Sequence, residues 1–218
     1  MEASKTLGYK VYFCADTHLG HKNIIQHCPE RASIGGFEPE DLDAHDEWVI
    51  DVWNKTVNKK DIVYICGDFT FLPAERAQKV LQRMRGRKFL ILGNHDKSVD
   101  HLVNYFEQII QMKEVVFKKD HWDFLDEDFR CFLCHYPMVT WPSKHYGTVN
   151  IHGHCHGRLD NFNKEQPDLR LDVGWDSTIA NHNLVDLETV YRHFKEKTNG
   201  QSFHCYARDL KQSRDMIV

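Results

Sequence analysis

Residues 11–18, Val-Tyr-Phe-Cys-Ala-Asp-Thr-His, place an acid and a histidine directly after a short apolar run. Four more short apolar runs along the chain are also followed by polar residues or glycine. The later apolar runs are 62–66, 89–92, 131–134 and 149–151, and they are followed by Gly67-Asp68, Gly93-Asn94-His95-Asp96, His135 and His152-Gly153-His154-Cys155-His156. Short apolar runs bounded by polar residues are typical of strands that are buried on both faces, so we expect five such strands.

The segments between the first three runs have the spacing of helices. Apolar residues recur every three or four positions over 40–57, and Pro73 is placed to open a second helix that reaches Met84. Alternating strands and helices predict a parallel β-α-β core. Less helix connects the later strands, which predicts a second or mixed sheet. We expect a C-terminal helix over 184–197, no clear structure over 199–218, and one domain over 1–218.

The polar residues at the strand ends are expected to form one site. In open α/β sheets, ligands bind beyond the carboxyl ends of the strands. The chain separations, 52 residues from Asp16 to Asp68 and then 26, 41 and 19 to the following ends, are too long for a local chelating loop. Only a folded sheet would bring these side chains together.

The residue types at the strand ends indicate metal ions. The candidate ligands are Asp16, His18, Asp68, Asn94, His135, His154 and His156. This mixture of oxygen and nitrogen donors suits Mn, Fe, Zn or Ni better than Ca or Mg. Seven ligands exceed the four of a tetrahedral zinc site, and with one bridging carboxylate they fit two ions about 3.5–4 Å apart.

In their order along the chain, the motifs Asp16-x-His18, Gly67-Asp68, Gly93-Asn94-His95-Asp96, His135 and Gly153-His154-x-His156 resemble those of calcineurin-like metallophosphoesterases. The resemblance spans roughly positions 10 to 185, and residues 16–23 and 135–137 are similar to small bacterial and phage members. It implies a four-layer α/β/β/α sandwich, in which two mixed sheets are flanked by helices and the dimetal site lies at the carboxyl ends of the strands.

The resemblance also implies a role for each ligand. One ion would be held by Asp16, His18 and His156, the other by Asn94, His135 and His154, and Asp68 would bridge them. Catalysis would proceed by in-line attack of a metal-bound hydroxide on phosphorus. His95 would act beside the leaving oxygen as the catalytic acid or charge stabiliser, and Asp96 is placed to orient its ring.

Three further residues are candidates for substrate binding because they lie close to the motifs in sequence: His21, Asn23 and Arg158. For His21 and Asn23 a solvated loop is an equal alternative, and for Arg158 the alternative is an ordinary surface arginine. His152 alternates with His154, but we expect it in the core or behind the ligands.

The overall composition limits the classes of partner. Lys and Arg total 28 against 32 Asp and Glu, a net charge of −4, which argues against binding nucleic acid through its phosphates. The sequence contains no run of 18 apolar residues, so no membrane helix is predicted. Residues 1–10 lack the apolar stretch of a secretion signal. Seven cysteines without a secretion signal indicate a reducing cytoplasm.

The predicted function is hydrolysis of small phosphate monoesters or diesters with two divalent ions, of which Mn is favoured and Fe, Zn and Ni are alternatives. A nuclease of the same family and a non-catalytic metal-binding interaction module are the alternatives from other classes. The sequence leaves open the physiological substrate, the preference for monoester or diester, the native metal, the oligomeric state and the role of the C-terminal tail.

Overall fold

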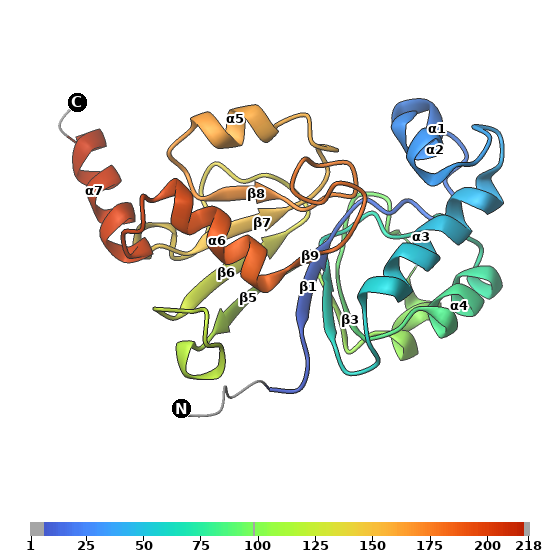
Figure 1. The fold of residues 1–218 in the computed structure, drawn as a ribbon, viewed down its shortest axis with the longest axis horizontal. Helices are drawn as coiled ribbons and strands as arrows, with labels where there is room; N and C mark the ends of the chain where they lie inside the picture. The colour runs from blue at the N-terminus through green and yellow to red at the C-terminus, as the bar shows by residue number, and fades with distance from the viewer. Residues whose placement is uncertain (1–6, 98, 216–218) are drawn as a thin grey trace.

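The computed structural model describes residues 7–97 and 99–215, and within them the strands form two mixed sheets (Figure 1). The first sheet has the order β4-β3-β2-β1-β9 and consists of β1 (Val11–Cys14), β2 (Ile62–Ile65), β3 (Arg87–Ile91), β4 (Gln108–Ile110) and β9 (Val185–Asp186). Strands β1 to β4 run parallel, and β9 pairs antiparallel with β1. The β-α-β core predicted from the sequence is therefore present.

The second sheet has the order β5-β6-β7-β8 and consists of β5 (Met112–Phe117), β6 (Phe129–Cys134), β7 (Val149–His152) and β8 (Arg170–Asp172). Strand β5 is antiparallel to β6, whereas the other two pairs are parallel. Both sheets are thus mixed, as the sequence indicated. Two of these strands, β5 and β8, do not follow the pattern of an apolar run and were not predicted.

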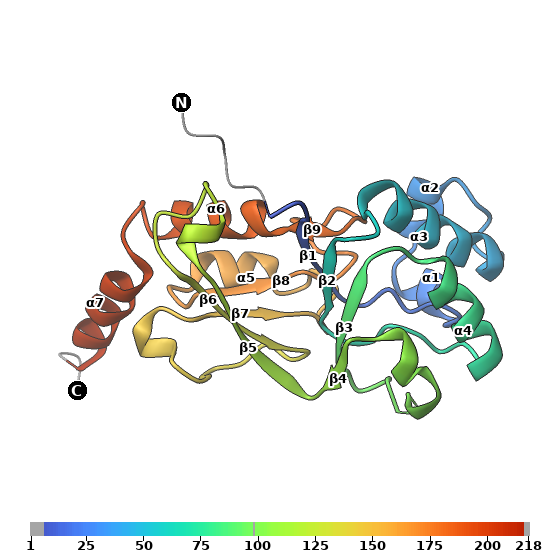
Figure 2. The same cartoon turned by 90° about the horizontal axis from the view of Figure 1, so that it is seen from below.

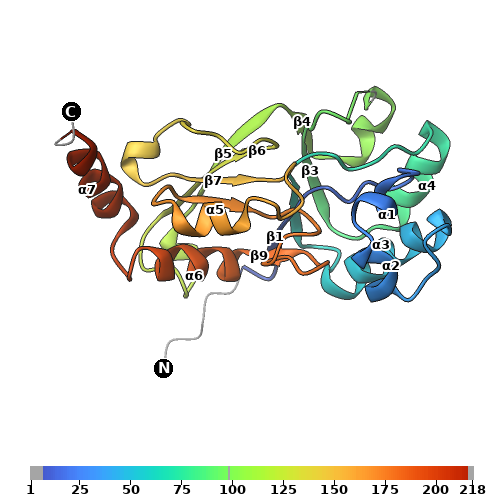
Figure 3. The ribbon, with the colours of Figure 1, turned by 90° about the horizontal axis from the view of Figure 1, so that it is seen from above.

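Helices flank both sheets. The helices of the described residues are α1 (Ile24–His27), α2 (Glu30–Gly35), α3 (Leu42–Thr56), α4 (Ala74–Arg83), α5 (Asp160–Glu165), α6 (Leu187–Lys197) and α7 (Phe203–Asp215), with 3₁₀ turns at Asp100–Tyr105, Lys119–His121 and Lys144–Tyr146. Figures 2 and 3 show α1 to α4 gathered at the end of the molecule opposite α7. No helix in the part of the chain that the structure describes has the length and apolar character needed to cross a membrane.

Strand β1 shows why the layers form in this order. Val11 and Phe13 face the core between the two sheets, while Tyr12 and Cys14 face the core beneath α3 and α4. Successive strand side chains point to opposite faces, so an uninterrupted apolar run can fill two cores at once. Because of this alternation, the four residues of β1 pack against the second sheet on one face and against α3 and α4 on the other.

Two helices begin later than predicted, and local hydrogen bonds explain both differences. Helix α3 begins at Leu42, because the Asp41 carboxylate accepts from the Ala44 N–H and caps the helix. The helix expected from residue 184 begins only at Leu187, because 185–186 pair with β1 and Asp186 becomes the helix cap. The tail is less irregular than expected, since α7 occupies most of it, and residues 216–218 lie outside the described residues.

The two sheets are joined where the ligand-bearing strands end. The N–H of Asp16 donates to the carbonyl of Gly67 within the first sheet, and the N–H of Gly153 donates to the carbonyl of His135 within the second. A parallel bridge between Ala15 and Gly174 connects the two edges. The carboxyl ends of β1, β2, β6 and β7 therefore meet at one place, and the loop after β3 reaches the same place.

Candidate metal centre

The first ligand group consists of Asp16, His18 and His156, whose ligand atoms lie within 4.8 Å of one another. Asp16 is fully buried and His18 is 3% exposed. One oxygen of Asp16, Oδ2, accepts from the His154 N–H at 2.9 Å, but within the part of the chain that the structure describes, its Oδ1 and both ring nitrogens of His18 lack a hydrogen-bond partner. Buried polar atoms without partners are costly, so these atoms fit a cation as the missing partner.

The second group consists of Asp68, His135 and His154, which also have ligand atoms within 4.8 Å. The His135 Nδ1–H donates to the carbonyl of Cys66 at 2.8 Å, which leaves the Nε2 lone pair facing the site. This Nε2 lies 3.1 Å from Asn94 Oδ1 and 3.3 Å from Asp68 Oδ2. Three electron-pair donors thus converge on one another, an arrangement that either a shared proton or a cation stabilises.

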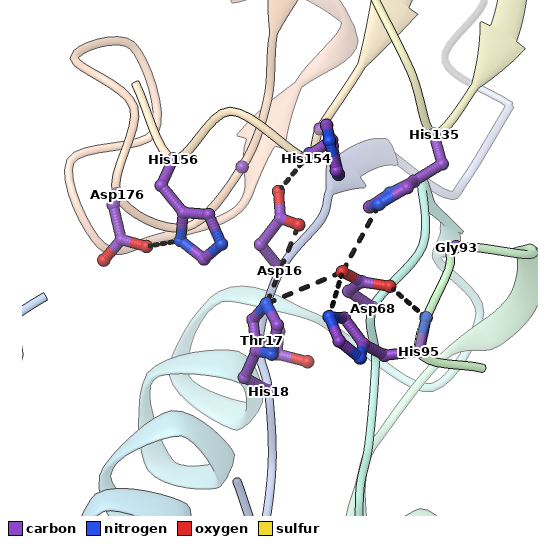
Figure 4. Close-up of polar contacts among 12 residues, drawn as sticks. Asp16, Thr17, His18, Asp68, Gly93, His95, His135, His154, His156 and Asp176 are labelled. Carbon is purple, nitrogen blue, oxygen red and sulfur yellow. Dashed lines mark hydrogen bonds and ion pairs between the residues drawn. The ribbon is translucent and has the colours of Figure 1, made fainter. Parts of the chain in front are cut away.

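Asp68 lies between the two groups (Figure 4). Its Oδ2 is 3.8 Å from His18 Nε2 in the first group and 3.3 Å from His135 Nε2 in the second. Its other oxygen, Oδ1, accepts from the N–H of His95 at 2.9 Å. One carboxylate oxygen therefore faces both groups, which would allow it to bridge two ions.

The electrostatics of the site favour a cation. Burial, reinforced by the charges of Asp172 and Asp68, raises the pKa of Asp16 well above its usual range. Burial lowers the pKa of His18 to about 2, so its imidazole is neutral and free to donate electron pairs. Burial also raises the pKa of Asp68, but His135 outweighs it and brings that pKa down to about 2. Asp16 is thus a buried carboxylate beside other acids, an environment that a divalent ion would stabilise.

The backbone at the ligands is strained. Five of the candidate ligands have a left-handed φ between 49° and 70°, namely Asp16, His18, Asp68, His154 and His156. Residues with a side chain rarely adopt this conformation, and it persists only where surrounding contacts enforce it. Here hydrogen bonds between the loops after β1 and β2 enforce it, because the His18 and Leu19 N–H groups donate to the Asp68 and Phe69 carbonyls. Such strain is concentrated at functional sites.

Asp96 has a different role from the one expected. Its carboxylate accepts from the backbone N–H groups of Gly93, Asp68 and Phe69 at 2.8–3.0 Å, and no contact with the His95 ring is recorded among the described residues. Asp96 therefore holds the loop of Asp68 rather than the imidazole beside it in sequence. The expectation failed because neighbouring residues in a turn point their side chains in different directions.

The remaining predicted residues lie around this centre at different depths. His95 has a side chain 42% exposed, with Nε2 4.0 Å from Asp68 Oδ2. His21 stacks on Phe71 at 4.2 Å, and both rings are within 6.2 Å of the His95 ring. Asn23 is exposed at the start of α1 and forms no capping hydrogen bond with its side chain. Arg158 is exposed, two residues after His156.

Two other groups of three side chains have ligand atoms within 4.8 Å: Cys28, His156 and Asp176, and His152, Cys155 and Asp172. In the first group, His156 Nδ1 already donates to Asp176 at 2.7 Å. In the second, the two ring nitrogens of His152 are occupied by the Gly153 carbonyl and the Asn163 amide. Nδ1 of His156 and both ring nitrogens of His152 therefore have no free electron pair for an ion at these two places, whereas Nε2 of His156 stays available to the first ligand group. His152 is buried and lies behind the ligands, as expected.

Two residues in contact with this centre, Arg31 and Asp176, were not predicted from the sequence. The Asp176 carboxylate accepts from His156 and from the guanidinium of Arg31. Neither residue belongs to a strand-end motif, and a charged residue outside such motifs normally indicates solvent exposure. The spacing of Arg31 and Asp176, 145 positions, carries no local signal.

Comparisons with known proteins agree with this geometry. The family model of calcineurin-like phosphoesterases matches residues 9–212, so the chain belongs to that family. The chain is 27% identical to an uncharacterized protein of Methanocaldococcus jannaschii, over 84% of this chain and 90% of that protein. It is also 27% identical to the gene 66 protein of Mycobacterium phage D29, over 83% and 93%. The fold is similar to a solved structure of a protein of unknown function from Aquifex aeolicus, with a TM-score of 0.59, 22% identity, and coverage of 87% of this chain and 99% of that one.

Proposed function

We propose that the protein hydrolyses small phosphate monoesters or diesters at a centre of two divalent metal ions. The observation that carries this proposal is the position of Asp68 Oδ2, which faces His18 of one ligand group and His135 of the other. Two bound ions would neutralise charge on the phosphoryl oxygens and would acidify a water molecule for attack on phosphorus. Membership of the calcineurin-like phosphoesterase family supports this reaction class.

His95 is the residue that we assign to proton transfer. Its backbone N–H is fixed by Asp68 Oδ1, while its side chain is 42% exposed and open to a substrate arriving from solvent. The ring also packs against Phe71, with centroids 4.8 Å apart, which limits its rotation. A positioned imidazole beside the ions is suited to donate a proton to the leaving ester oxygen.

Substrate recognition is assigned to the residues around His95. His21 shares the face of Phe71 with His95 and would contact the group attached to the phosphate. Arg158 is exposed close to His156, where a guanidinium would pair with a non-bridging phosphate oxygen. Asn23 is the least supported of the three, because it lies further along the same loop with no recorded contact to either ligand group among the described residues.

The donor set favours Mn²⁺ as the metal ion. Carboxylate oxygens, the Asn94 amide oxygen and imidazole nitrogens face the centre, and neither ligand group contains a cysteine. Hard and intermediate donors of this kind suit Mn²⁺, while Fe²⁺, Zn²⁺ and Ni²⁺ are the alternatives to be compared.

The test is hydrolysis of a chromogenic phosphomonoester and a chromogenic phosphodiester. Protein treated with a chelator is reloaded in parallel with Mn²⁺, Fe²⁺, Ni²⁺ or Zn²⁺, and turnover is expected with at least one ion and one substrate class. An Asp68→Asn variant serves as the matched control, because it keeps the side-chain volume but loses the bridging charge. A wild-type protein that binds two ions and remains inert towards a broad panel of both substrate classes would contradict the proposal.

Two measurements separate the alternatives. Cleavage of single- or double-stranded DNA or RNA on a gel, with no turnover of small esters, would favour a nuclease; the net charge of −4 leads us to expect the opposite. Elemental analysis after reconstitution addresses the non-catalytic alternative, because fewer than two ions per chain would favour an interaction module.

A further inference from the structure

Arg31 is a fully buried arginine behind the ligand group of Asp16, His18 and His156. Its Nη2 donates to the carbonyl of Asp16 at 2.7 Å, and its Nη1 donates to the carbonyl of Thr17 at 3.0 Å. These carbonyls belong to the strained loop that carries two of the three ligands. A buried guanidinium is tolerated only when its donors are satisfied, so Arg31 constrains this backbone strongly.

The same guanidinium reaches the third ligand through Asp176. Arg31 Nε and Nη2 donate to the two oxygens of Asp176 at 2.8 and 2.6 Å, the geometry of a bidentate pair. Asp176 Oδ2 also accepts from His156 Nδ1 at 2.7 Å. By accepting from Nδ1, the Asp176 carboxylate keeps the proton of His156 on that nitrogen and leaves Nε2 free for an ion (Figure 4).

Helix α3 anchors the guanidinium from the opposite side. Arg31 Nη1 is 3.2 Å from His45 Nε2, and His45 Nδ1 is 3.0 Å from Asp46 Oδ1. Burial lowers the pKa of His45, so its ring is neutral and Nε2 accepts from Arg31. Asp46 Oδ1 in turn accepts from the N–H of Gly20, at the end of the ligand loop. Arg31 is therefore held in one position by partners on three separate segments.

The second ligand group is positioned by other contacts. His135 is oriented by the carbonyl of Cys66, and the backbone of Asp68 is held by Asp96. Among the described residues, the guanidinium of Arg31 donates to the loop after β1, to α3 and to Asp176, and not to the second ligand group. The side chains of Arg31 and Asp176 thus support the first ligand group and make no hydrogen bond to the second in the part of the chain that the structure describes.

We propose that Arg31 and Asp176 are positioning residues for the ion held by Asp16, His18 and His156, and that they set its affinity independently of the other ion. This inference rests on the proposed two-ion centre. It is consistent with the strained φ of 57° at Asp16 and 52° at His18, a conformation that hydrogen bonds to the Asp16 and Thr17 carbonyls help to maintain.

The variants Arg31→Lys and Asp176→Asn test the inference by metal titration. Lysine keeps the charge but lacks the planar fork, and asparagine keeps the shape of aspartate but lacks its charge. Removing contacts that orient a metal ligand typically weakens binding about 10- to 100-fold. Calorimetric titration of the metal-free variants with Mn²⁺ should therefore show one ion bound that much more weakly and the other with wild-type affinity.

Arg170→Lys is the matched control, because Arg170 is also buried and donates to a backbone carbonyl, that of Met138, at 3.2 Å. It should bind both ions as the wild type does. At a Mn²⁺ concentration that fills only the tighter site, electron paramagnetic resonance of Arg31→Lys should show an isolated ion where the wild type shows a coupled pair. Raising the Mn²⁺ concentration should restore both the coupled signal and turnover, which a merely misfolded variant would not do.

Two ions bound with wild-type affinity in both variants would overturn the inference, as would equal weakening of both ions. Melting curves establish that each variant is folded before titration; if Arg31→Lys does not fold, Asp176→Asn carries the test alone, since it changes one atom. The metal titration does not depend on whether the protein hydrolyses an ester. A wild-type protein that binds two ions but hydrolyses no ester would refute the proposed function and leave this inference to the titration.

Discussion

Replacing Gly67 with alanine should disturb the metal centre through one contact that the structure measures. Gly67 has a φ of +92°, and a Cβ added there would lie 2.3 Å from Nδ1 of His135 and 2.8 Å from the backbone Cα of Gly93. Ordinary van der Waals contact begins at 3.4 Å. The His135 ring would therefore have to move by about 1 Å (3.4 − 2.3), and the backbone of Gly93 blocks an easy adjustment of residue 67 itself.

The size of the effect follows from this displacement. Metal–ligand distances in proteins hold to within about 0.2 Å, so a shift of about 1 Å should cost the ion bound by His135 at least about 10- to 100-fold in affinity. The variant also pays for alanine at positive φ, about 1–2 kcal/mol, and for the clash, about 1–3 kcal/mol. Gly36→Ala is the matched control, because Gly36 has a φ of +71° and open space around its Cβ position.

Urea unfolding of the metal-free proteins and calorimetric titration with Mn²⁺ separate the two contributions. Gly36→Ala should lose about 1–2 kcal/mol of stability and bind both ions normally, whereas Gly67→Ala should lose more stability and bind one ion weakly. Equal stability losses and wild-type Mn²⁺ affinity in both variants would refute the reasoning, because they would mean that the His135 ring does not require the space above Gly67.

Four further predictions follow from the same contacts. His95→Ala should retain two ions by elemental analysis but lower kcat about 10²- to 10⁴-fold; full activity would remove His95 from the reaction. Burial raises the pKa of Asp172 to about 6, above its unfolded value of about 3.9, so its contribution to stability is complete below about pH 4 and lost as the pH rises through about 6. In urea unfolding without metal, Asp172→Asn should accordingly lose less stability than the wild type between about pH 4 and 7, and parallel curves would argue against this assignment. A chelator should lower the melting temperature and added Mn²⁺ should restore it, because each ion at a hundredfold excess over its Kd adds about 2.7 kcal/mol to the free energy of unfolding. A melting temperature that neither the chelator nor Mn²⁺ changes would contradict a metal centre. Asp41→Ala should remove the cap of α3 and lower the free energy of unfolding in urea by about 1 kcal/mol, and an unchanged free energy of unfolding would contradict the capping role.

Composition carried less information about this site than position did. The chain has 15 histidines, yet only five of them occupy predicted places at the strand ends: His18, His95, His135, His154 and His156. His21 adds a ring beside His95, and His45 supports Arg31 from α3. A histidine count therefore could not have located the centre, whereas the residues that follow each apolar run could.

Two strands of the second sheet, β5 and β8, were not predicted, each for its own physical reason. Strand β5 lies at a sheet edge, alternates exposed with half-buried residues and carries Lys113 and Glu114, so it lacks a continuous apolar run. Strand β8 is fully buried but contains Arg170 and Asp172, whose polar groups find partners inside the protein. Hydrophobic runs reveal strands buried among apolar neighbours, and they cannot reveal strands whose burial depends on specific polar contacts.

The sequence by itself determined the five central strands, the helices between the first three, and the polar residues expected at one edge. These features are local, since a strand depends on a run of apolar residues and its end on the next residue. Only the tertiary structure decided that Asp96 supports Asp68, that five candidate ligands adopt a left-handed backbone, and that Arg31 pairs with Asp176. Such contacts join segments up to 145 positions apart. Hydrogen bonds between segments so distant in sequence form only once the sheets have packed and excluded water from both partners.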